Sequence, residues 1–116
     1  MSELRWARVR TDANCRLRRG AWYRVMWLTP AEAVLDVNSS PVGVSRSLLT
    51  MLPTHPLVWS VVPRPRNSGE LPMSWGPCYA VCPNCKDRAR LGSAVSMRCA
   101  RCSGVFEVGW GDPYFA

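Results

Sequence analysis

The residues best suited to chemistry in this chain are two Cys-x-x-Cys pairs. Cys82 and Cys85 form the first pair, in CPNC, and Cys99 and Cys102 form the second, in CARC, with thirteen residues between the pairs. Each pair can supply two thiolates from one tight turn. A hairpin in the spacer would then bring both turns to one tetrahedral metal ion. A redox dithiol and a pair of disulfides are the alternatives.

The surroundings of the cysteines favour the metal over both alternatives. A redox pair is more often a single Cys-x-x-Cys at the start of a helix beside a βαβ unit, and no such helix is indicated here. The stretch MSELRWARVR (1–10) has no apolar core of a signal peptide, and no apolar run approaches a membrane span. We therefore expect a cytoplasmic protein without a membrane partner, in a reducing compartment that disfavours disulfides.

The segment around the pairs has the pattern of a small β hairpin. Gly92 and Ser93 lie in the middle of the spacer, where its turn is expected, and SGVFEV (103–108) alternates as a strand. Gly104 follows Cys102 closely, at a place where a tight turn needs a residue without Cβ.

Residues 80–110 resemble the zinc ribbon family. The resemblance implies one structural Zn²⁺ with Cys82, Cys85, Cys99 and Cys102 as ligands. Four thiolates leave no open position for water, so this zinc would stabilise the fold and perform no chemistry. A ribbon of this length cannot build a large core, and metal ligation would replace it.

Two further cysteines lie outside the pairs. Cys78 precedes Cys82 by four residues and could substitute as a ligand, although we favour a small buried apolar side chain. Cys15 lies in an arginine-rich loop, where we expect a part-buried free thiol.

The N-terminal module, residues 1–52, is predicted to be a run of short strands. RRGAWYRV (18–25), AVLDVNSSPVGVS (33–45) and RSLLTML (46–52) resemble three parts of SH3-like small β-barrels. These are the strand after the long loop, the distal hairpin, and the helical turn before the last strand. The long loop is basic, as in small barrels associated with RNA or DNA, and lacks the acidic residues of peptide-binding SH3 domains.

The remaining chain completes a mostly β fold class: an SH3-like barrel followed by a C-terminal zinc ribbon. Residues 53–77 hold six of the ten prolines and are predicted to be a proline-rich linker with a strand at 57–62. Residues 78–116 are predicted to form the zinc ribbon with an aromatic tail that contains Trp110, Tyr114 and Phe115.

The charge of the chain is strongly positive, at +7, and Lys86 is its only lysine. Four thiolates and one Zn²⁺ would carry −2 together, which leaves about +5. The planar guanidinium group of arginine can form paired hydrogen bonds with phosphate and carboxylate groups. The expected partner is therefore a polyanion, or an acidic protein face.

The arginines gather in two groups, which we predict to contact nucleic acid. The first spans fifteen residues whose only acid is Asp12, with Trp6 or Trp22 available for stacking. Its members are Arg5, Arg8, Arg10, Arg16, Arg18 and Arg19. The second group is Arg88, Arg90, Arg98 and Arg101. The alternatives are a solvated basic loop with core tryptophans, and ribbon cations that only offset the zinc-thiolate charge.

Catalysis has little support in the sequence. His55 is the only histidine and lies in the proline-rich segment, and the eight acids form no spaced pair. No glycine-rich phosphate loop or metalloprotease motif is present. We expect a non-catalytic nucleic-acid-binding accessory factor without a small-molecule substrate. The alternative is a protein-interaction subunit that docks on a larger complex.

Overall fold

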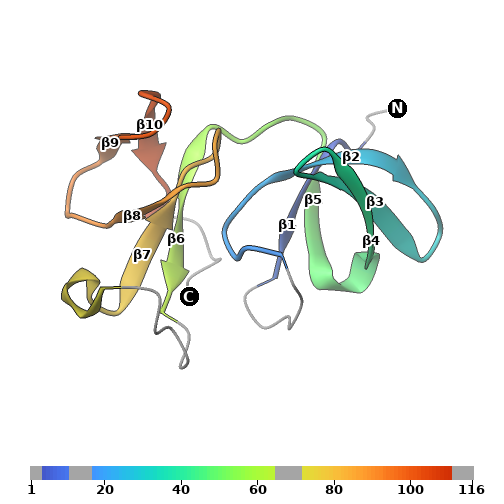
Figure 1. Ribbon diagram of the computed structural model, residues 1–116, viewed down its shortest axis with the longest axis horizontal. Helices are drawn as coiled ribbons and strands as arrows, with labels where there is room; N and C mark the ends of the chain where they lie inside the picture. Colours follow the sequence, from blue (N-terminus) through green and yellow to red (C-terminus); the bar gives the residue numbers. More distant parts are fainter. Residues whose placement is uncertain (1–3, 11–16, 65–71, 111–116) are drawn as a thin grey trace. The chain divides into compact units, whose positions relative to one another are not determined.

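The computed structural model describes residues 4–10, 17–64 and 72–110. The chain divides into two compact units, residues 1–56 and 57–116, and each is built on its own five-stranded sheet (Figure 1). The described residues are mostly β, as expected, with two single-turn 3-10 helices.

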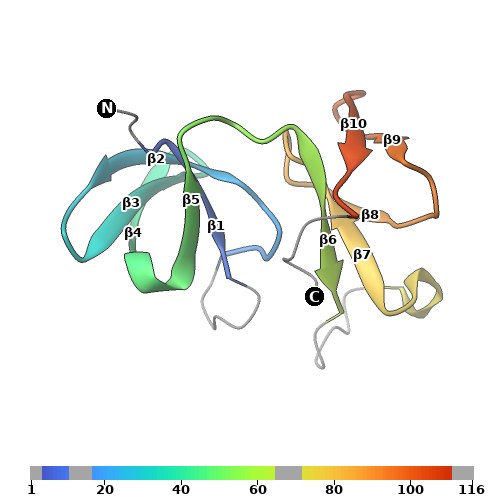
Figure 2. The ribbon, with the colours of Figure 1, turned by 180° about the vertical axis from the view of Figure 1, so that it is seen from behind.

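The first unit is an antiparallel sheet in which the last strand returns to the first. Its order is β4-β3-β2-β1-β5, so that β1 pairs with both β2 and β5 and the sheet curls into a half-barrel (Figure 2). The elements are β1 (Trp6–Val9), β2 (Tyr23–Leu28), β3 (Glu32–Val37), β4 (Ser40–Ser45), the 3-10 turn η1 (Arg46–Leu48) and β5 (Leu49–Leu52). This is the element order that the resemblance to SH3-like barrels predicted.

Alternation along the strands builds the core of the first unit. Ala7 and Val9 of β1 and Ala33 and Leu35 of β3 are all completely buried, each pair two residues apart on one face. The hairpin between β3 and β4 turns through two residues, Asn38 and Ser39, with φ of 52° and 67°. Two successive left-handed residues match the twist of a tight hairpin and fix its register.

The second unit has a mixed sheet of order β8-β7-β6-β10-β9. Strands β6 and β10 run parallel, and the other neighbours are antiparallel. The elements are β6 (Val58–Pro63), η2 (Met73–Trp75), β7 (Cys78–Val81), β8 (Arg88–Arg90), β9 (Ser96–Arg98) and β10 (Val105–Val108).

The strand expected at 57–62 is present as β6, but it is not part of a linker. It is the central strand of the second sheet, paired with β7 on one side and β10 on the other. Trp59, Val61 and Val62 are at most 1% exposed. Proline richness marked this stretch as a linker, whereas Pro63 only ends the strand and leaves the buried run WSVV (59–62) intact.

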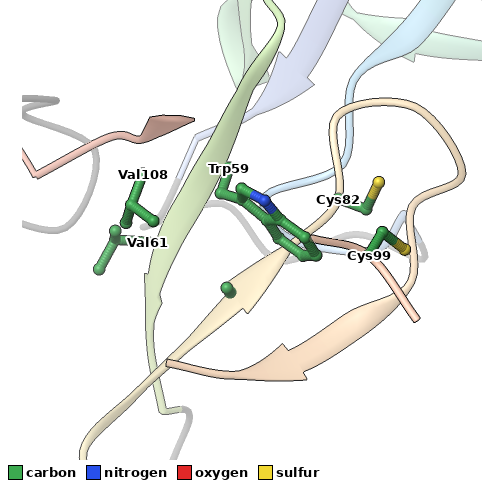
Figure 3. Packing of buried hydrophobic residues seen from close by; sticks show 6 residues of the cluster. Trp59, Val61, Cys82, Cys99 and Val108 are labelled. Carbon is green, nitrogen blue, oxygen red and sulfur yellow. The ribbon is translucent and has the colours of Figure 1, made fainter. Parts of the chain in front are cut away.

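The core of the second unit joins this central strand to the cysteine pairs. Buried Trp59, Val61, Cys82, Cys99 and Val108 belong to one cluster, together with Ala80. Figure 3 shows the indole of Trp59 extending toward Cys82 and Cys99, while Val61 and Val108 lie at its other end. The indole N–H donates to the carbonyl of Met97 at 3.0 Å, which ties β9 to the core.

Only the beginning of the aromatic tail can be placed. Trp110 is 40% exposed, and its indole N–H donates to the carbonyl of Ala94 at 2.9 Å. Tyr114 and Phe115 lie outside the described residues. Among the described residues, no helix has the length and apolar character needed to cross a membrane.

Candidate metal centre and basic surfaces

The four paired cysteines meet at one point of the second unit. Their sulfur atoms all lie within 4.8 Å of one another. The Sγ atoms of Cys82 and Cys102 are 3.7 Å apart, and those of Cys85 and Cys99 are 3.5 Å apart. A zinc ion with sulfurs at about 2.3 Å has S–S edges of about 3.8 Å. The cluster therefore fits one tetrahedral metal ion.

The two cysteine turns have the same backbone hydrogen bonds. In the first, the Cys82 N–H donates to the Asp87 carbonyl at 2.8 Å, and the Lys86 N–H donates to the Cys82 carbonyl at 3.2 Å. In the second, the Cys99 N–H donates to the Gly104 carbonyl at 2.8 Å.

The second turn also repeats the other bond, since the Ser103 N–H donates to the Cys99 carbonyl at 2.9 Å. Lys86 and Ser103 are both left-handed, with φ of 66° and 65°. The turns thus present their sulfurs from matching backbones.

Gly104 is needed for close packing rather than for a left-handed turn. The left-handed residue is its neighbour Ser103, and Gly104 is not among the glycines with positive φ. A Cβ on Gly104 would lie 2.6 Å from the ring of Phe106. The sequence identified a position that excludes Cβ, but the reason is the aromatic ring that β10 places over it.

The cysteines differ in their protonation. Burial raises the pKa of Cys82 to about 12 and also raises the pKa of Cys85. Hydrogen bonds from the Asn84 side chain and then from the Gly104 N–H lower the pKa of Cys102 to about 6. A cationic metal stabilises all thiolates, so it would displace protons from Cys82 and Cys85 on binding.

Backbone amides favour the thiolate forms within this buried setting. The Asn84 N–H donates to the Cys82 sulfur at 3.4 Å. The backbone N–H of Asp87 lowers the pKa of Cys85, and the backbone N–H of Gly104 lowers the pKa of Cys102. In both cases the donor follows its cysteine by two residues. Amide donors prepare the sulfurs for a cation because they stabilise the charged form of each thiol.

Of the two remaining cysteines, Cys78 lies among the described residues and is not part of the cluster. Cys78 is half-buried and packs against the apolar cluster of the second unit, but its sulfur is not one of the four that converge. This placement agrees with its interpretation as a small apolar side chain. Cys15 lies outside the described residues.

No relatives were found. Comparison of the chain with protein-family models, with curated proteins and with solved structures gave no match.

The first arginine group is only partly on the surface. Arg5 and Arg10 are exposed, Arg18 and Arg19 are half-buried, and Arg16 lies outside the described residues. Arg8 is 5% exposed, with its guanidinium 4.6 Å from the centre of the Trp22 ring.

Trp22 itself is 3% exposed. Arg8 and Trp22 thus form a buried cation–π pair and do not present a surface, so we remove both from the predicted contact set. The density of arginines in this stretch predicted a surface position for Arg8, and no local pattern indicated that a ring covers it.

Trp6 and His55 form a stacked pair in the first unit. Their ring centres are 3.8 Å apart and the planes differ by 12°. His55 is half-buried, so this histidine of the proline-rich segment packs on an aromatic ring rather than lying in solvent.

The second arginine group lies in the second unit, close in sequence to the four clustered cysteines. Arg88 and Arg90 share one face of the edge strand β8, and the Arg88 guanidinium lies 5.9 Å from the centre of the Tyr79 ring. Arg90 is exposed, as are Arg98 and Arg101 on either side of Cys99.

The first unit has a groove that the sequence did not predict. It has a volume of about 820 Å³ and is lined by Leu4, Arg5, Trp6, Arg24, Val25, Met26, Trp27 and Leu28. It extends from the start of β1 along β2 as far as the last residue of that strand. A register shift between Val25 and Trp27 shapes it, and no local sequence signal reports such a shift.

Proposed function

We propose that this chain is a small β protein that holds one structural zinc ion in a zinc-ribbon-like centre and binds nucleic acid without catalysis. Zinc is the metal best matched to four thiolates in a tetrahedron. All four positions of the ion would be taken by sulfur, so no position remains for water or substrate. The role of the centre is to hold the second sheet together.

The observation that carries the nucleic-acid proposal is the exposure of arginines on both units. Among the described residues, the exposed cations of the first unit are Arg5, Arg10 and Arg24, and those of the second are Arg90, Arg98 and Arg101. With zinc bound, the net charge would still be about +5. Such a surface attracts phosphates and releases their counterions on binding.

A salt series tests this proposal. Labelled single- and double-stranded DNA and RNA are titrated with zinc-loaded protein from low to physiological salt. The logarithm of the affinity should fall linearly with the logarithm of the salt concentration. Arg90→Gln and Arg98→Gln should each reduce the slope of log affinity against log salt by the share of about one phosphate contact. No binding at low salt would refute the proposal.

Arg46→Gln is the matched control for these variants. Arg46 is outside both predicted groups, and its guanidinium donates to the Thr29 carbonyl at 3.2 Å within the first unit. Its substitution removes the same charge without removing a proposed phosphate contact. An equal effect of Arg46→Gln and Arg90→Gln would mean that net charge alone drives the binding.

A protein partner is the second candidate, and one observation favours it. Val95 and Val105, beside and within the β9–β10 hairpin, are 77% and 64% exposed. Exposed apolar side chains near a short edge strand suit a protein surface better than a phosphate backbone. Val105→Asp would weaken such a complex and leave nucleic-acid binding unchanged, which separates the two functions.

A further inference from the structure

We infer that the groove of the first unit is a binding site for single-stranded nucleic acid, with Trp27 as the stacking platform for a base. The inference rests on the proposed function and adds to it a place on the molecule and a preference for unpaired strands. It follows from the register of β2, from the exposure of its side chains and from the position of two arginines.

The register shift turns Trp27 outward. Val25 pairs with Leu35, whereas Trp27 pairs with Val34, so Met26 is an extra residue in β2. Leu35 is completely buried. Neighbouring residues of a strand face opposite sides, and paired residues share a side, so Val34 and Trp27 lie on the face away from the core.

The same face carries Arg24 and Trp6. Trp6 of β1 pairs with Arg24 of β2, while the next pair, Ala7 with Tyr23, points into the core. Without the extra residue, alternation would place Trp27 with Val25 on the inner side. The shift therefore brings an aromatic ring to the face on which an exposed arginine already lies.

Large apolar side chains are exposed along this part of β2. Trp27 is 52% exposed, Met26 is 49% exposed and Leu28 is 37% exposed. Leaving three such neighbours in water has a cost, and a folded protein rarely gathers them without a ligand or partner. The groove volume of about 820 Å³ lies in the range of sites that hold small organic groups such as a nucleoside.

The charges of the groove select a polyanionic ligand. Arg5 and Arg24 are its charged lining residues, and both are exposed. His55 stacks on Trp6 at 3.8 Å and holds this second ring in place. A single strand offers a phosphate and a flat base at each step, so it can engage arginine and tryptophan together.

Other macromolecules use only part of this arrangement. In a duplex the base faces are stacked on one another, and a ring such as Trp27 cannot reach them. An acidic peptide satisfies the arginines but brings no aromatic face at each step. A single strand is therefore the ligand that uses both chemical features of the groove.

The test measures the affinity of Trp27 variants for matched strands. The ligands are a labelled oligothymidylate of about twelve nucleotides, the same length in oligouridylate, and a duplex of equal length. We expect the single strands to bind more tightly than the duplex. Trp27→Ala should weaken single-strand binding by roughly tenfold to a hundredfold, because one stacked base is lost.

Three further variants make the result specific. Trp27→Phe keeps a flat ring and should retain most of the affinity, although it changes the same residue. Trp110→Ala removes a 40% exposed tryptophan of the second unit and should leave binding unchanged. Arg24→Gln should weaken both ligand types and reduce the salt slope by about 0.7 for single strands.

The outcomes separate this inference from the proposed function. Equal affinity for strand and duplex, with Trp27→Ala binding like the parent protein, would overturn the groove site and leave nucleic-acid binding by the arginines intact. No binding of any nucleic acid at low salt would overturn the proposed function itself. Displacement of the strand by polyglutamate at equal charge concentration would assign the groove to an acidic protein segment instead.

Discussion

Lys86 and Ser103 occupy equivalent places in the two turns that form the cysteine cluster. Each is the fourth residue after the first cysteine of its pair, and their φ angles are 66° and 65°. Each donates its N–H back to the carbonyl of that cysteine. Two Cys-x-x-Cys sequences that otherwise differ thus adopt one turn, and this turn brings four sulfurs to a spacing that could hold one metal ion.

The first prediction concerns the left-handed positions. Ser103→Gly should keep or slightly raise the free energy of unfolding of the metal-loaded protein, since glycine adopts this φ without a Cβ penalty. Ser103→Val should lower it by about 1–2 kcal/mol, because a branched Cβ is strained there. Chemical denaturation at fixed zinc concentration measures both. An unchanged free energy of unfolding in Ser103→Val would contradict the assigned turn.

The second prediction concerns Gly104 and Phe106. Gly104→Ala places a methyl group 2.6 Å from the Phe106 ring and should destabilise the second unit by about 1–3 kcal/mol. Phe106→Leu frees this space, so the double variant should lose less than the two single variants together. Additive losses in the unfolding free energies would mean that the ring is not the obstacle.

The third prediction concerns the metal. Purified without chelator, the protein should contain about one zinc per chain. Replacing the zinc by Co²⁺ should give intense sulfur-to-metal charge-transfer absorption with a tetrahedral d–d spectrum. Cys82→Ser and Cys99→Ser should abolish tight binding, whereas Cys78→Ser should not, because its sulfur lies outside the cluster. Full zinc content in Cys99→Ser would exclude the assigned site.

The fourth prediction is the pH dependence of metal affinity. The pKa of Cys82 is raised to about 12 and that of Cys85 is raised as well, so both thiols carry protons at neutral pH. Protons therefore compete with the metal, and affinity must fall as pH falls. With two protons displaced, the fall is about a hundredfold or more per pH unit between pH 8 and pH 6.

Cys102 sharpens this dependence at lower pH. Its pKa is lowered to about 6, so its sulfur is already a thiolate at pH 7 and takes up a proton only below that value. The slope should therefore steepen below pH 6. Competition with a chromophoric chelator across pH 5 to 8 measures it, and an affinity independent of pH would rule out the buried thiols as ligands.

The fifth prediction compares two tryptophans with the same kind of hydrogen bond. Trp59→Phe removes a completely buried indole and its bond to the Met97 carbonyl, which should cost about 1–3 kcal/mol. Trp110→Phe removes an equivalent bond to the Ala94 carbonyl at an exposed position, where water can replace it. Its cost should stay below about 0.5 kcal/mol. Equal shifts in the thermal unfolding midpoint would contradict the assigned burial.

Local features of this protein were readable from the sequence. The spacing of Cys82, Cys85, Cys99 and Cys102 predicted the cysteine cluster, because each short turn presents two sulfurs. The tight hairpin at Asn38 and Ser39 was expected as well. Both depend on residues within a few positions of one another. The spacer is not the expected hairpin: β8 pairs with β7 and β9 pairs with β10, so each cysteine turn connects its own pair of strands.

Features that depend on distant pairing required the structure. Residues 58–63 contain enough apolar side chains for a strand, but only pairing with β7 and β10 makes this strand the centre of the second sheet. Arg8 is charged and would be expected at the surface, but the Trp22 ring covers its guanidinium. In both cases the partner lies many residues away, where a local pattern carries no information about contact.

The sequence by itself determined a mostly β chain with one cluster of four cysteines and an excess of arginine, because alternation, spacing and charge are local properties. The tertiary structure decided which arginines and tryptophans meet solvent. One extra residue in β2 reverses the side to which Trp27 points, and the register that reveals it belongs to the pairing of β2 with β3 rather than to either strand alone.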